Sequence, residues 1–324
     1  MTSHDGQNPG LQIEVESTAC LACGSSDATI VARGKDYLHE TSDQEYRFCQ
    51  CSACGHLYLN PRPTIREISR IYPAEYATFT KRFGRADSLL AKIKDRVLLG
   101  RFNAFSERVS DSMSLMDIGC GDGRFLLALR KRYPRAKLTA LDWSFGPTVA
   151  EELAAANIQT IAGEIETADL PDETYDVITM NQLIEHVWDV RLVLERCRRA
   201  LKVGGLLALE TPNPDGWDRR FFRAGGWGSY YWPRHLNLFT RPHLSRIVTE
   251  AGMDVVLSQS LLAPPCWIYS CQFSAKRAGM GRWSSRLFPD TSTPLLAAFT
   301  VLDRIALLLG AETSNQKMVA RRVR

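Results

Sequence analysis

The stretch LMDIGCGDGRFLLAL, residues 115–129, decides the fold of this chain. Its first residues form an apolar run that predicts a buried strand, and the residues after Arg124 have the spacing of a helix. Three glycines lie between the two, at Gly119, Gly121 and Gly123. Glycines in this position let a ligand approach the backbone closely, and the helix N-terminus offers free N–H groups. The stretch therefore predicts a loop that holds a nucleotide-like ligand.

The spacing of the glycines separates this loop from two other nucleotide-binding loops. The dinucleotide fingerprint is GxGxxG, whereas this loop reads GxGxG and has Arg124 where the third glycine would stand. A phosphate-binding P-loop is excluded because no Gly-Lys-Ser/Thr follows. Asp117 precedes the glycines, and Asp142 ends the next predicted strand. A carboxylate at Asp142 can accept both hydroxyls of a ribose and would repel a 2′-phosphate.

From residue 113 onward, short apolar runs alternate with stretches of helical spacing. Asp189 is placed to cap the N-terminus of one of these helices. Strands that alternate with helices indicate a parallel sheet covered on both faces, which is an α/β fold. We predict strands at 114–118, 137–141, 158–162, 175–180, 206–210 and 254–258 with a last strand in 316–324, and helices at 124–132, 147–156, 189–200 and 243–251.

Taken in order, these motifs resemble class I S-adenosylmethionine (SAM)-dependent methyltransferases of the small-molecule type, similar to methyltransferase domain 23. The segment LIEHVWD, residues 183–189, looks like the LEHVxD-type motif of that family. The resemblance implies SAM as cofactor and a Rossmann-like, doubly wound sheet of seven strands with the last strand antiparallel. The residues that it implies for SAM are Asp117, Gly119, Cys120, Gly121 and Gly123 along the loop, Asp142 on the ribose, Trp143 against the adenine, Glu164 and Ile165 at the adenine pocket, and Asn181 and Gln182 beside the methyl donor.

Two histidines are candidates for catalysis. Methyl transfer is an in-line displacement, so the enzyme mainly aligns the reacting atoms, and a base is needed only for a poorly ionised nucleophile such as a hydroxyl. His235 lies in YYWPRHLNLF, residues 230–239, where the family places its substrate lid, and its pKa range suits a base. His186 follows the fourth strand. A structural role stays open for both residues.

Aromatic residues crowd the expected lid, residues 214–240. Such side chains can form an apolar pocket or favour a cation, or they can simply pack the lid in place, and both roles stay open. Gly225, Gly226 and Gly228 would permit the lid to close. The residues that we assign to the substrate lid are Trp227, Tyr230, Tyr231 and Trp232.

Two CxxC pairs precede the sheet: Cys20 with Cys23, and Cys51 with Cys54. This spacing suits structural zinc held by four thiolates, and the metal would supply the folding energy of so small a module. Cys49 and His56 are the competing ligands. A zinc ribbon followed by NPRP and a SAM domain resembles a methyltransferase subfamily of polysaccharide and secondary-metabolite pathways.

The chain divides into four zones by composition. We predict a disordered N-terminus at 1–17, a zinc-binding module at 18–62 and a helical linker or cap at 64–112, with apolar residues such as Leu89 and Ile93 at helical spacing. The methyltransferase domain would occupy 113–324, with the lid at 214–240 and a helical insertion at 261–312.

Length, net charge and the distribution of apolar residues limit the classes of partner and the cellular location that we expect. With 324 residues and a net charge of +4, the chain is long enough for a large core and too weakly basic to indicate nucleic acid by itself. Residues 1–17 are polar and lack the apolar region of a signal peptide, and the longest apolar run is interrupted by Asp303 and Arg304, so we expect a cytoplasmic protein. The run at 294–310 leaves peripheral membrane contact open, and the oligomeric state is open too.

The expected activity is methylation of a small-molecule acceptor, with oxygen as the first choice. Oxygen, nitrogen and carbon acceptors are not separable from the sequence. A sugar C-methyltransferase is an alternative, although an additional C-terminal domain of that class is absent. An RNA methyltransferase that uses the zinc ribbon is another, but the ribbon has few basic residues and [DN]PP[YF] is missing after the fourth strand. A binding module with a decayed SAM fold conflicts with the intact GxGxG loop.

Overall fold

The computed structural model describes residues 12–72, 99–100, 110–222, 224–281 and 283–323. Packing divides the chain into two compact units, each assembled from three separate segments. We call Met1–Ala74, Pro212–Thr240 and Ser260–Asn315 the cysteine unit, because it contains both CxxC pairs. The sheet unit comprises Glu75–Thr211, Arg241–Gln259 and Gln316–Arg324.

The sheet unit is built on seven strands in the order β12-β13-β10-β9-β6-β7-β8. The ladders β9–β10, β6–β9, β6–β7 and β7–β8 are parallel, and the last strand of the chain runs antiparallel. This order confirms the doubly wound Rossmann-like sheet. The strands are β6 (Ser114–Ile118), β7 (Lys137–Asp142), β8 (Gln159–Ala162), β9 (Tyr175–Asn181), β10 (Leu201–Pro212), β12 (Met253–Leu261) and β13 (Asn315–Arg322).

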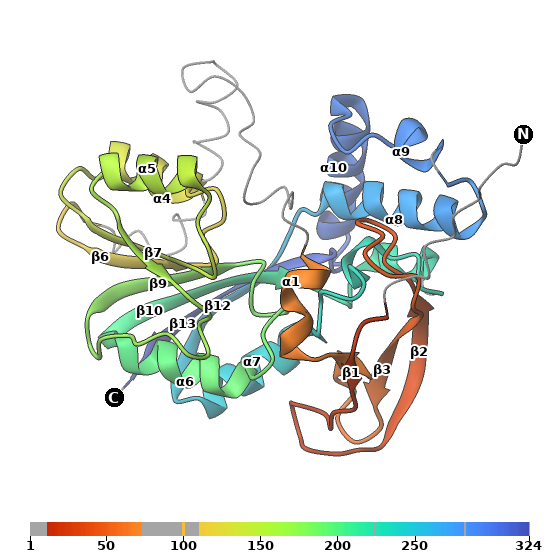
Figure 1. The fold of residues 1–324 in the computed structure, drawn as a ribbon, viewed down its shortest axis with the longest axis horizontal. Helices are drawn as coiled ribbons and strands as arrows, with labels where there is room; N and C mark the ends of the chain where they lie inside the picture. Colours follow the sequence, from red (N-terminus) through yellow and green to blue (C-terminus); the bar gives the residue numbers. More distant parts are fainter. Residues whose placement is uncertain (1–11, 73–98, 101–109, 223, 282, 324) are drawn as a thin grey trace, which may run out of the picture. The chain divides into compact units, whose positions relative to one another are not determined.

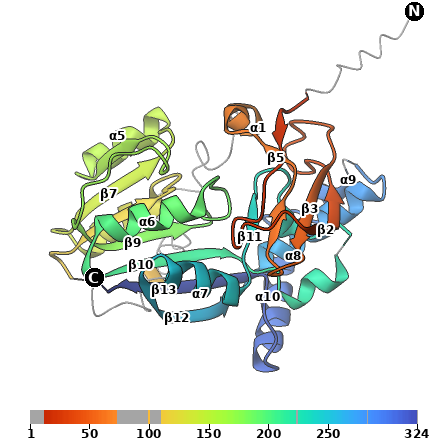
Figure 2. The same ribbon diagram turned by 90° about the horizontal axis from the view of Figure 1, so that it is seen from below.

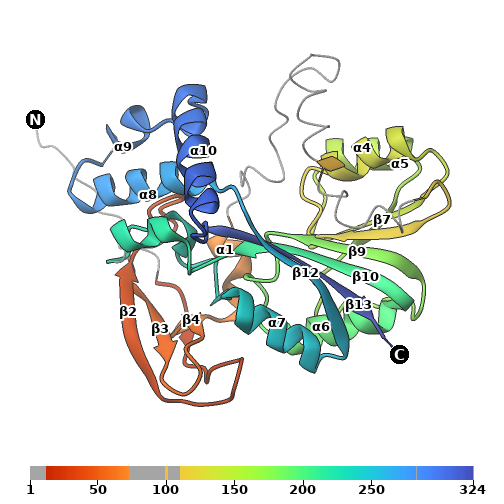
Figure 3. The ribbon, with the colours of Figure 1, turned by 180° about the vertical axis from the view of Figure 1, so that it is seen from behind.

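Helices cover both faces of this sheet (Figures 1 and 3). Two of them, α4 and α5, lie over one face, and α6 and α7 lie over the other. The side chain of Asp189 accepts a hydrogen bond from the backbone N–H of Leu192, so its predicted role as an N-cap is confirmed. The helices are α4 (Arg124–Arg132), α5 (Pro147–Ala155), α6 (Val190–Ala200) and α7 (Arg241–Glu250).

The core of the sheet unit forms where apolar strand residues meet the apolar sides of α4 and α5. Leu115, Val177 and Ala140 from the strands pack with Leu126 and Leu129 from α4, and all five side chains are fully buried. Burial of this kind is worth about 1.5–3 kcal/mol for each large aliphatic side chain. The sheet therefore supplies a rigid base for the loops at its carboxyl edge.

The cysteine unit contains a second, four-stranded sheet in the order β11-β4-β3-β2 (Figure 2). All three ladders of this sheet are antiparallel. Its edge strand β11 comes from the expected lid, so residues far apart in the sequence complete one sheet. The strands are β2 (Ala28–Gly34), β3 (Tyr46–Cys51), β4 (Leu57–Leu59) and β11 (Asn237–Leu238), with a separate pair of β1 (Val15–Glu16) and β5 (Arg62–Pro63).

The cysteine unit also contains short and long helices, and three of them follow β12 in the sequence. In Figure 2, α8 lies between the four-stranded sheet and α10. The helices of this unit are η1 (Ile65–Glu67), α1 (Ile68–Ile71), η3 (Trp217–Phe221), η4 (Gly228–Tyr230), α8 (Pro264–Arg277), α9 (Trp283–Leu287) and α10 (Thr293–Leu308). Over the described residues, no helix combines the length and apolar character that a membrane span requires.

Several expectations for the outer segments differ from the structure. Residues 15–16 of the expected disordered zone form β1, and residues 1–11 lie outside the described residues. Of the expected helical zone, residues 65–71 are helical, whereas Leu89, Ile93 and most of the rest lie outside the described part. The strand predicted at 206–210 begins earlier, at Leu201, because Gly204 and Gly205 lie inside β10, where the pairing shifts register between Leu201 and Leu206.

The packing also groups the segments differently from the predicted domains. We expected the lid at 214–240 and the insertion at 261–312 to be parts of the methyltransferase domain. In the structure, both pack with the N-terminal module and belong to the cysteine unit. The physical reason is pairing over a long sequence distance, since β11 joins β4 and η4 packs on α8.

Candidate functional site

The glycine loop lies in the sheet unit, between β6 and α4. Gly119, Gly121 and Gly123 all have positive φ values, of 72°, 56° and 67°. This left-handed backbone is costly for any residue with a Cβ, which explains the choice of glycine at all three positions. At Gly123 a Cβ would also lie 2.9 Å from Leu153 Cδ2. The loop is therefore built to turn sharply before α4 begins, and the N–H groups of Gly119, Cys120 and Gly123 donate to backbone carbonyls.

Asp142 ties the glycine loop to the end of β7. Its Oδ2 accepts a hydrogen bond of 2.8 Å from the backbone N–H of Gly121, and its Oδ1 accepts one of 2.8 Å from Trp143. Burial raises the pKa of Asp142 to about 6, although these two N–H groups act to lower it. Each carboxylate oxygen retains a further lone pair, which is the capacity that two ribose hydroxyls require.

Asp117 holds the base of the same loop. It is buried on β6, and its Oδ1 accepts a hydrogen bond of 2.6 Å from the hydroxyl of Thr179 on β9. Cys120 is buried as well, next to Gly121 in the loop. The side chain of Asp117 thus joins two neighbouring strands directly below the glycines.

The other residues expected at the cofactor also follow strands of the sheet unit. Ile165 is buried and Glu164 half-buried, and both come after β8. Asn181 ends β9, and Gln182 adopts a left-handed backbone with φ of 53° while its N–H donates to the carbonyl of Glu210 at 2.7 Å. Because the carboxyl ends of parallel strands meet at one edge of the sheet, these residues lie at the same edge as Asp142.

Glu185 is a buried acid that directly precedes His186 in the segment LIEHVWD. It is 0% exposed, and its Oε2 accepts a hydrogen bond of 2.8 Å from the hydroxyl of Thr211. Burial raises the pKa of Glu185 to about 8, against the opposing hydrogen bond from Thr211. His186, the second catalytic candidate, is half-buried in the turn that follows, with its N–H bonded to the carbonyl of Leu183 at 2.8 Å.

His235 lies in the cysteine unit, in the segment between η4 and β11. Its ring is buried, and Nδ1 lies 2.7 Å from the carbonyl oxygen of Ser229. A carbonyl only accepts hydrogen bonds, so this contact assigns the proton of a neutral ring to Nδ1 and the lone pair to Nε2. The ring of Tyr231 packs against the imidazole with centroids 5.0 Å apart.

The aromatic residues of the expected lid divide into two groups. Trp227, Tyr230 and Trp232 are each at most 1% exposed. Phe48 of β3 lies 5.0 Å from the rings of both Tyr230 and Trp232. These three side chains therefore pack the interior of the cysteine unit, and only Tyr231 of the four is half-buried.

A glycine in the lid serves the same close packing. A Cβ at Gly225 would lie 1.9 Å from the carbonyl oxygen of Arg33, and the backbone there has a φ of 103°. The residue permits β2 and the lid to approach each other more closely than any side chain allows. Closure of a hinge, the role that we expected, does not account for this contact.

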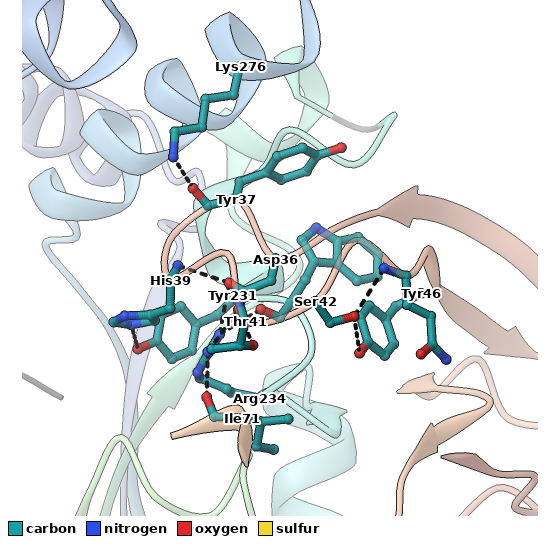
Figure 4. A network of polar contacts seen from close by, with 12 residues as sticks. Asp36, Tyr37, His39, Thr41, Ser42, Tyr46, Ile71, Tyr231, Arg234 and Lys276 are labelled. Carbon is teal, nitrogen blue, oxygen red and sulfur yellow. Dashed lines mark hydrogen bonds and ion pairs between the residues drawn. The ribbon is translucent and has the colours of Figure 1, made fainter. Parts of the chain in front are cut away.

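An ion pair that sequence reasoning missed holds the lid to the N-terminal module (Figure 4). The guanidinium of Arg234 donates to both oxygens of Asp36, at 3.0 and 2.9 Å, and neither side chain is exposed. It also donates to the carbonyls of Trp232 and Ile71. Burial raises the pKa of Asp36, but the hydrogen bonds and charge of Arg234 outweigh burial and hold it below its ordinary value.

Neighbours of this pair satisfy the remaining lone pairs of Asp36 and fix Tyr231. The hydroxyl of Thr41 donates to Asp36 Oδ2 at 2.6 Å, and the N–H of His39 donates to Oδ1 at 3.0 Å. His39 Nε2 lies 3.2 Å from the hydroxyl of Tyr231, and Arg234 lies over the Tyr231 ring at 5.4 Å. Burial, assisted by the charge of Arg234, lowers the pKa of His39 to about 4, so this histidine is neutral near pH 7.

The four cysteines of the two CxxC pairs converge at one end of the four-stranded sheet. All four Sγ atoms lie within 4.8 Å of one another, with Cys20 to Cys54 at 3.6 Å and Cys23 to Cys51 at 3.5 Å. Thiolates about 2.3 Å from a tetrahedral zinc ion would be about 3.8 Å apart, so the arrangement fits that ion. Four ligands would leave no open coordination position.

The two competing ligands point elsewhere. The thiol of Cys49 lies 3.6 Å from the carbonyl oxygen of Asn60, and the Nε2 atom of His56 lies 3.3 Å from the side-chain oxygen of Asn237. Tyr58 is 1% exposed and packs with Cys20 and Cys51. The geometry therefore favours the four CxxC cysteines as the ligand set.

The model of the methyltransferase domain family matches residues 90–258 of the chain. Since this match covers more than half of the 324 residues, the chain belongs to that family. Its strand order and glycine loop define the class I fold of SAM-dependent methyltransferases.

Individual relatives share parts of the chain. Malonyl-[acyl-carrier protein] O-methyltransferase of Xylella fastidiosa (strain M23) is 32% identical over 105 residues, which are 31% of this chain and 35% of the relative. (S)-Coclaurine N-methyltransferase of Thalictrum flavum subsp. glaucum is 28% identical over 123 residues, 36% of this chain and 34% of the relative. The chain thus spans about a third of the length of these two relatives.

A solved structure is similar in fold to most of this chain. Phosphoethanolamine N-methyltransferase 2 of Haemonchus contortus, in complex with SAM, has a TM-score of 0.51 to this chain at 14% identity. The match covers 92% of this chain and 69% of that chain. At this identity the likeness concerns the fold alone.

Proposed function

We propose that this protein transfers the methyl group of SAM to a small-molecule acceptor, with an oxygen atom as the nucleophile. The observation that carries the SAM site is the pair of 2.8 Å bonds by which Asp142 joins the glycine loop to β7. This arrangement presents a carboxylate and a glycine loop at one edge of the sheet. By their names, one of the relatives described above is an O-methyltransferase and the other is an N-methyltransferase.

The residues fit SAM by the chemistry of their donors and acceptors. Asp142 would accept the ribose hydroxyls, and the glycine loop would lie along the methionine part. Trp143, Glu164 and Ile165 would line the adenine pocket, and Asn181 and Gln182 would lie beside the methyl donor. When bound, SAM supplies an electrophilic methyl group on a sulfonium, so the protein mainly has to orient the acceptor and exclude water.

His235 is the residue that we propose as general base for a hydroxyl acceptor. Its Nδ1–H donates to the carbonyl of Ser229, so the lone pair of the neutral ring lies on Nε2. Proton removal by such a base contributes about 10²–10⁴-fold to a rate. His186 is the second candidate.

Replacement of Asp142 by alanine is expected to weaken SAM binding by about 10–150-fold, the loss of hydrogen bonds to a charged group. Affinity should also fall as the pH drops through about 6, because the carboxyl group of Asp142 takes up a proton there and loses its acceptor capacity. Calorimetric titration with SAM measures both effects. Asp169→Ala removes an exposed carboxylate of the same unit and serves as the control. An unchanged affinity of Asp142→Ala would remove this residue from the site.

His235→Ala is expected to lower the methyl-transfer rate by about 10²–10⁴-fold while leaving SAM affinity unchanged. The measurement needs an acceptor, which a label-transfer assay with methyl-labelled SAM and cell extract can identify. Label in the small-molecule fraction supports the proposed acceptor class, and label in RNA contradicts it. A His235→Ala enzyme with full activity would exclude this residue as the base.

We further propose that Cys20, Cys23, Cys51 and Cys54 hold one structural zinc ion. The support is the close convergence of four sulfurs at distances near those of a tetrahedral site. The ion would hold together two loops that contribute few apolar side chains of their own.

A further inference from the structure

The helix α10 exposes apolar side chains and buries a carboxylate. Its buried side carries Asp303, whose Oδ2 accepts a hydrogen bond of 2.6 Å from the N–H of Ala263 and whose Oδ1 accepts one of 2.9 Å from the indole of Trp267. Phe299 stacks on Trp267 with ring centroids 5.3 Å apart. These contacts fix the rotation of α10 on α8, so the opposite side of the helix is the one that faces outward.

The outward side of α10 is almost entirely aliphatic. Ile305 is 48% exposed, and Leu308 and Leu309 are 86% and 80% exposed. Arg304 is the only charged residue on the exposed side of this fully described helix. Monomeric proteins rarely expose a continuous apolar patch of more than a few hundred Å². The members of this patch, which we call the α10 stripe, are Ala297, Ala298, Val301, Leu302, Ile305, Leu308 and Leu309.

The spacing of the stripe is that of a helix that packs against another helix. Ala298, Val301, Ile305 and Leu308 follow one another at intervals of three, four and three residues. This is the a/d pattern of a coiled-coil seam, in which side chains of one helix fit between those of its partner. The 16 residues of α10 form a rod of about 24 Å, long enough for two full repeats of that pattern.

The stripe also changes in width along the helix, with small residues near the N-terminal end and leucines at the C-terminal end. Two copies related by a twofold axis perpendicular to the helix would pair antiparallel, so Ala297 and Ala298 of one copy would face Leu308 and Leu309 of the other. A parallel pair would instead place leucine against leucine at one end and leave a gap at the other. Self-complementarity of this kind is what a closed dimer requires.

We propose that the α10 stripe is a dimerisation surface, occupied by the same stripe of a second copy of this chain in antiparallel orientation. The exposed fractions of its five larger side chains amount to about three fully exposed aliphatic residues for each copy. That area is part of the roughly 800 Å² which each partner of a stable interface buries. A bilayer is a poorer match, because helices that lie on anionic membranes carry several basic residues on the polar side, and α10 carries Arg304 alone.

Sedimentation of the full chain at low to high micromolar concentration tests the proposal. We expect a dimer whose dissociation constant rises at least about 100-fold in Val301→Glu, because the substitution buries two unpaired charges, one from each copy. Val301 is 54% exposed, so this variant should fold, and circular dichroism checks that it does. Val203→Glu is the matched control, since Val203 is a valine of β10 with 57% exposure, and it should leave the dimer intact.

Cross-linking tests the orientation of the two helices. A bifunctional maleimide should join Leu302→Cys to itself, and should join Leu309→Cys to Ala297→Cys in a mixture far better than Leu309→Cys to itself. The chain without an added cysteine corrects for the native thiols. A monomer at high micromolar concentration, or a dimer unaffected by Val301→Glu, overturns the proposal. A different outcome would favour a lipid surface and overturn the proposal: the wild-type protein is monomeric and binds anionic vesicles, and Val301→Glu loses this binding.

Discussion

Replacement of Cys51 by serine is expected to abolish zinc binding and to unfold the N-terminal part of the cysteine unit. Binding of structural zinc contributes about 10–16 kcal/mol in small zinc peptides, which exceeds the stability of most whole domains. The loops at Cys20–Cys23 and Cys51–Cys54 have only a few buried apolar neighbours with which to replace it. Elemental analysis should change from one zinc ion per chain to none, and limited proteolysis should begin to cut between residues 18 and 62.

Cys49→Ser provides the matched control for this prediction. The residue is two positions from Cys51 and buried, but its sulfur faces the carbonyl of Asn60 rather than the other thiols. The variant should therefore retain its zinc. Wild-type protein without zinc after purification in the absence of chelators would contradict the metal site. Loss of zinc from Cys49→Ser together with its retention in Cys51→Ser would exchange the two residues in the ligand set.

Replacement of Asp36 by alanine is expected to destabilise the cysteine unit by about 3–5 kcal/mol, because it leaves the charge of Arg234 buried without its counterion. The loss should appear as a lower urea midpoint when tryptophan fluorescence is followed, since Trp227 and Trp232 are buried in the same unit. Removal of both charges in Asp36→Leu/Arg234→Met should recover much of this loss, because a matched apolar pair avoids the cost of burying ions.

The surface ion pair of Arg33 with Glu45 is the control for the buried one. Its two side chains are 47% and 50% exposed, and Glu45→Ala should cost at most about 1 kcal/mol. Equal effects of Asp36→Ala and Glu45→Ala would mean that the buried pair contributes no more than a solvated one. A double variant as unstable as Asp36→Ala would show that the hydrogen bonds to Ile71 and Trp232 matter more than the charges.

The sheet unit could be predicted from the sequence because its signals are local. The helix predicted at 124–132 is α4, and the strand predicted at 114–118 is β6, with the same boundaries. In both cases the apolar spacing lies within the element and glycines lie next to it. β10 is longer than the predicted strand at 206–210, because a register shift lets residues before the glycine pair continue the ladder.

The cysteine unit could be predicted only in part, because its structure depends on contacts between distant residues. The spacing of the CxxC pairs indicates their convergence, and the structure brings the four sulfurs together. Nothing near Asp36 in the sequence indicates its pairing with Arg234, which is 198 residues away. The aromatic residues of the lid were similarly ambiguous, because tryptophans such as Trp227 and Trp232 give the same sequence pattern whether they line a pocket or fill a core. Only the partners in three dimensions separate the two roles.

The completion of the four-stranded sheet by β11 has a consequence for synthesis of the chain. β4 is made early, but its partner is about 180 residues further on, as the separation of 181 between His56 and Asn237 illustrates. At about 5–20 residues per second, a ribosome needs roughly 10–40 s to cover that distance. During this interval the nascent chain presents the unpaired N–H and C=O groups of β4, and an open strand edge is a template for pairing with other chains. We therefore expect chaperones that cover this strand edge during synthesis to raise the yield of folded protein.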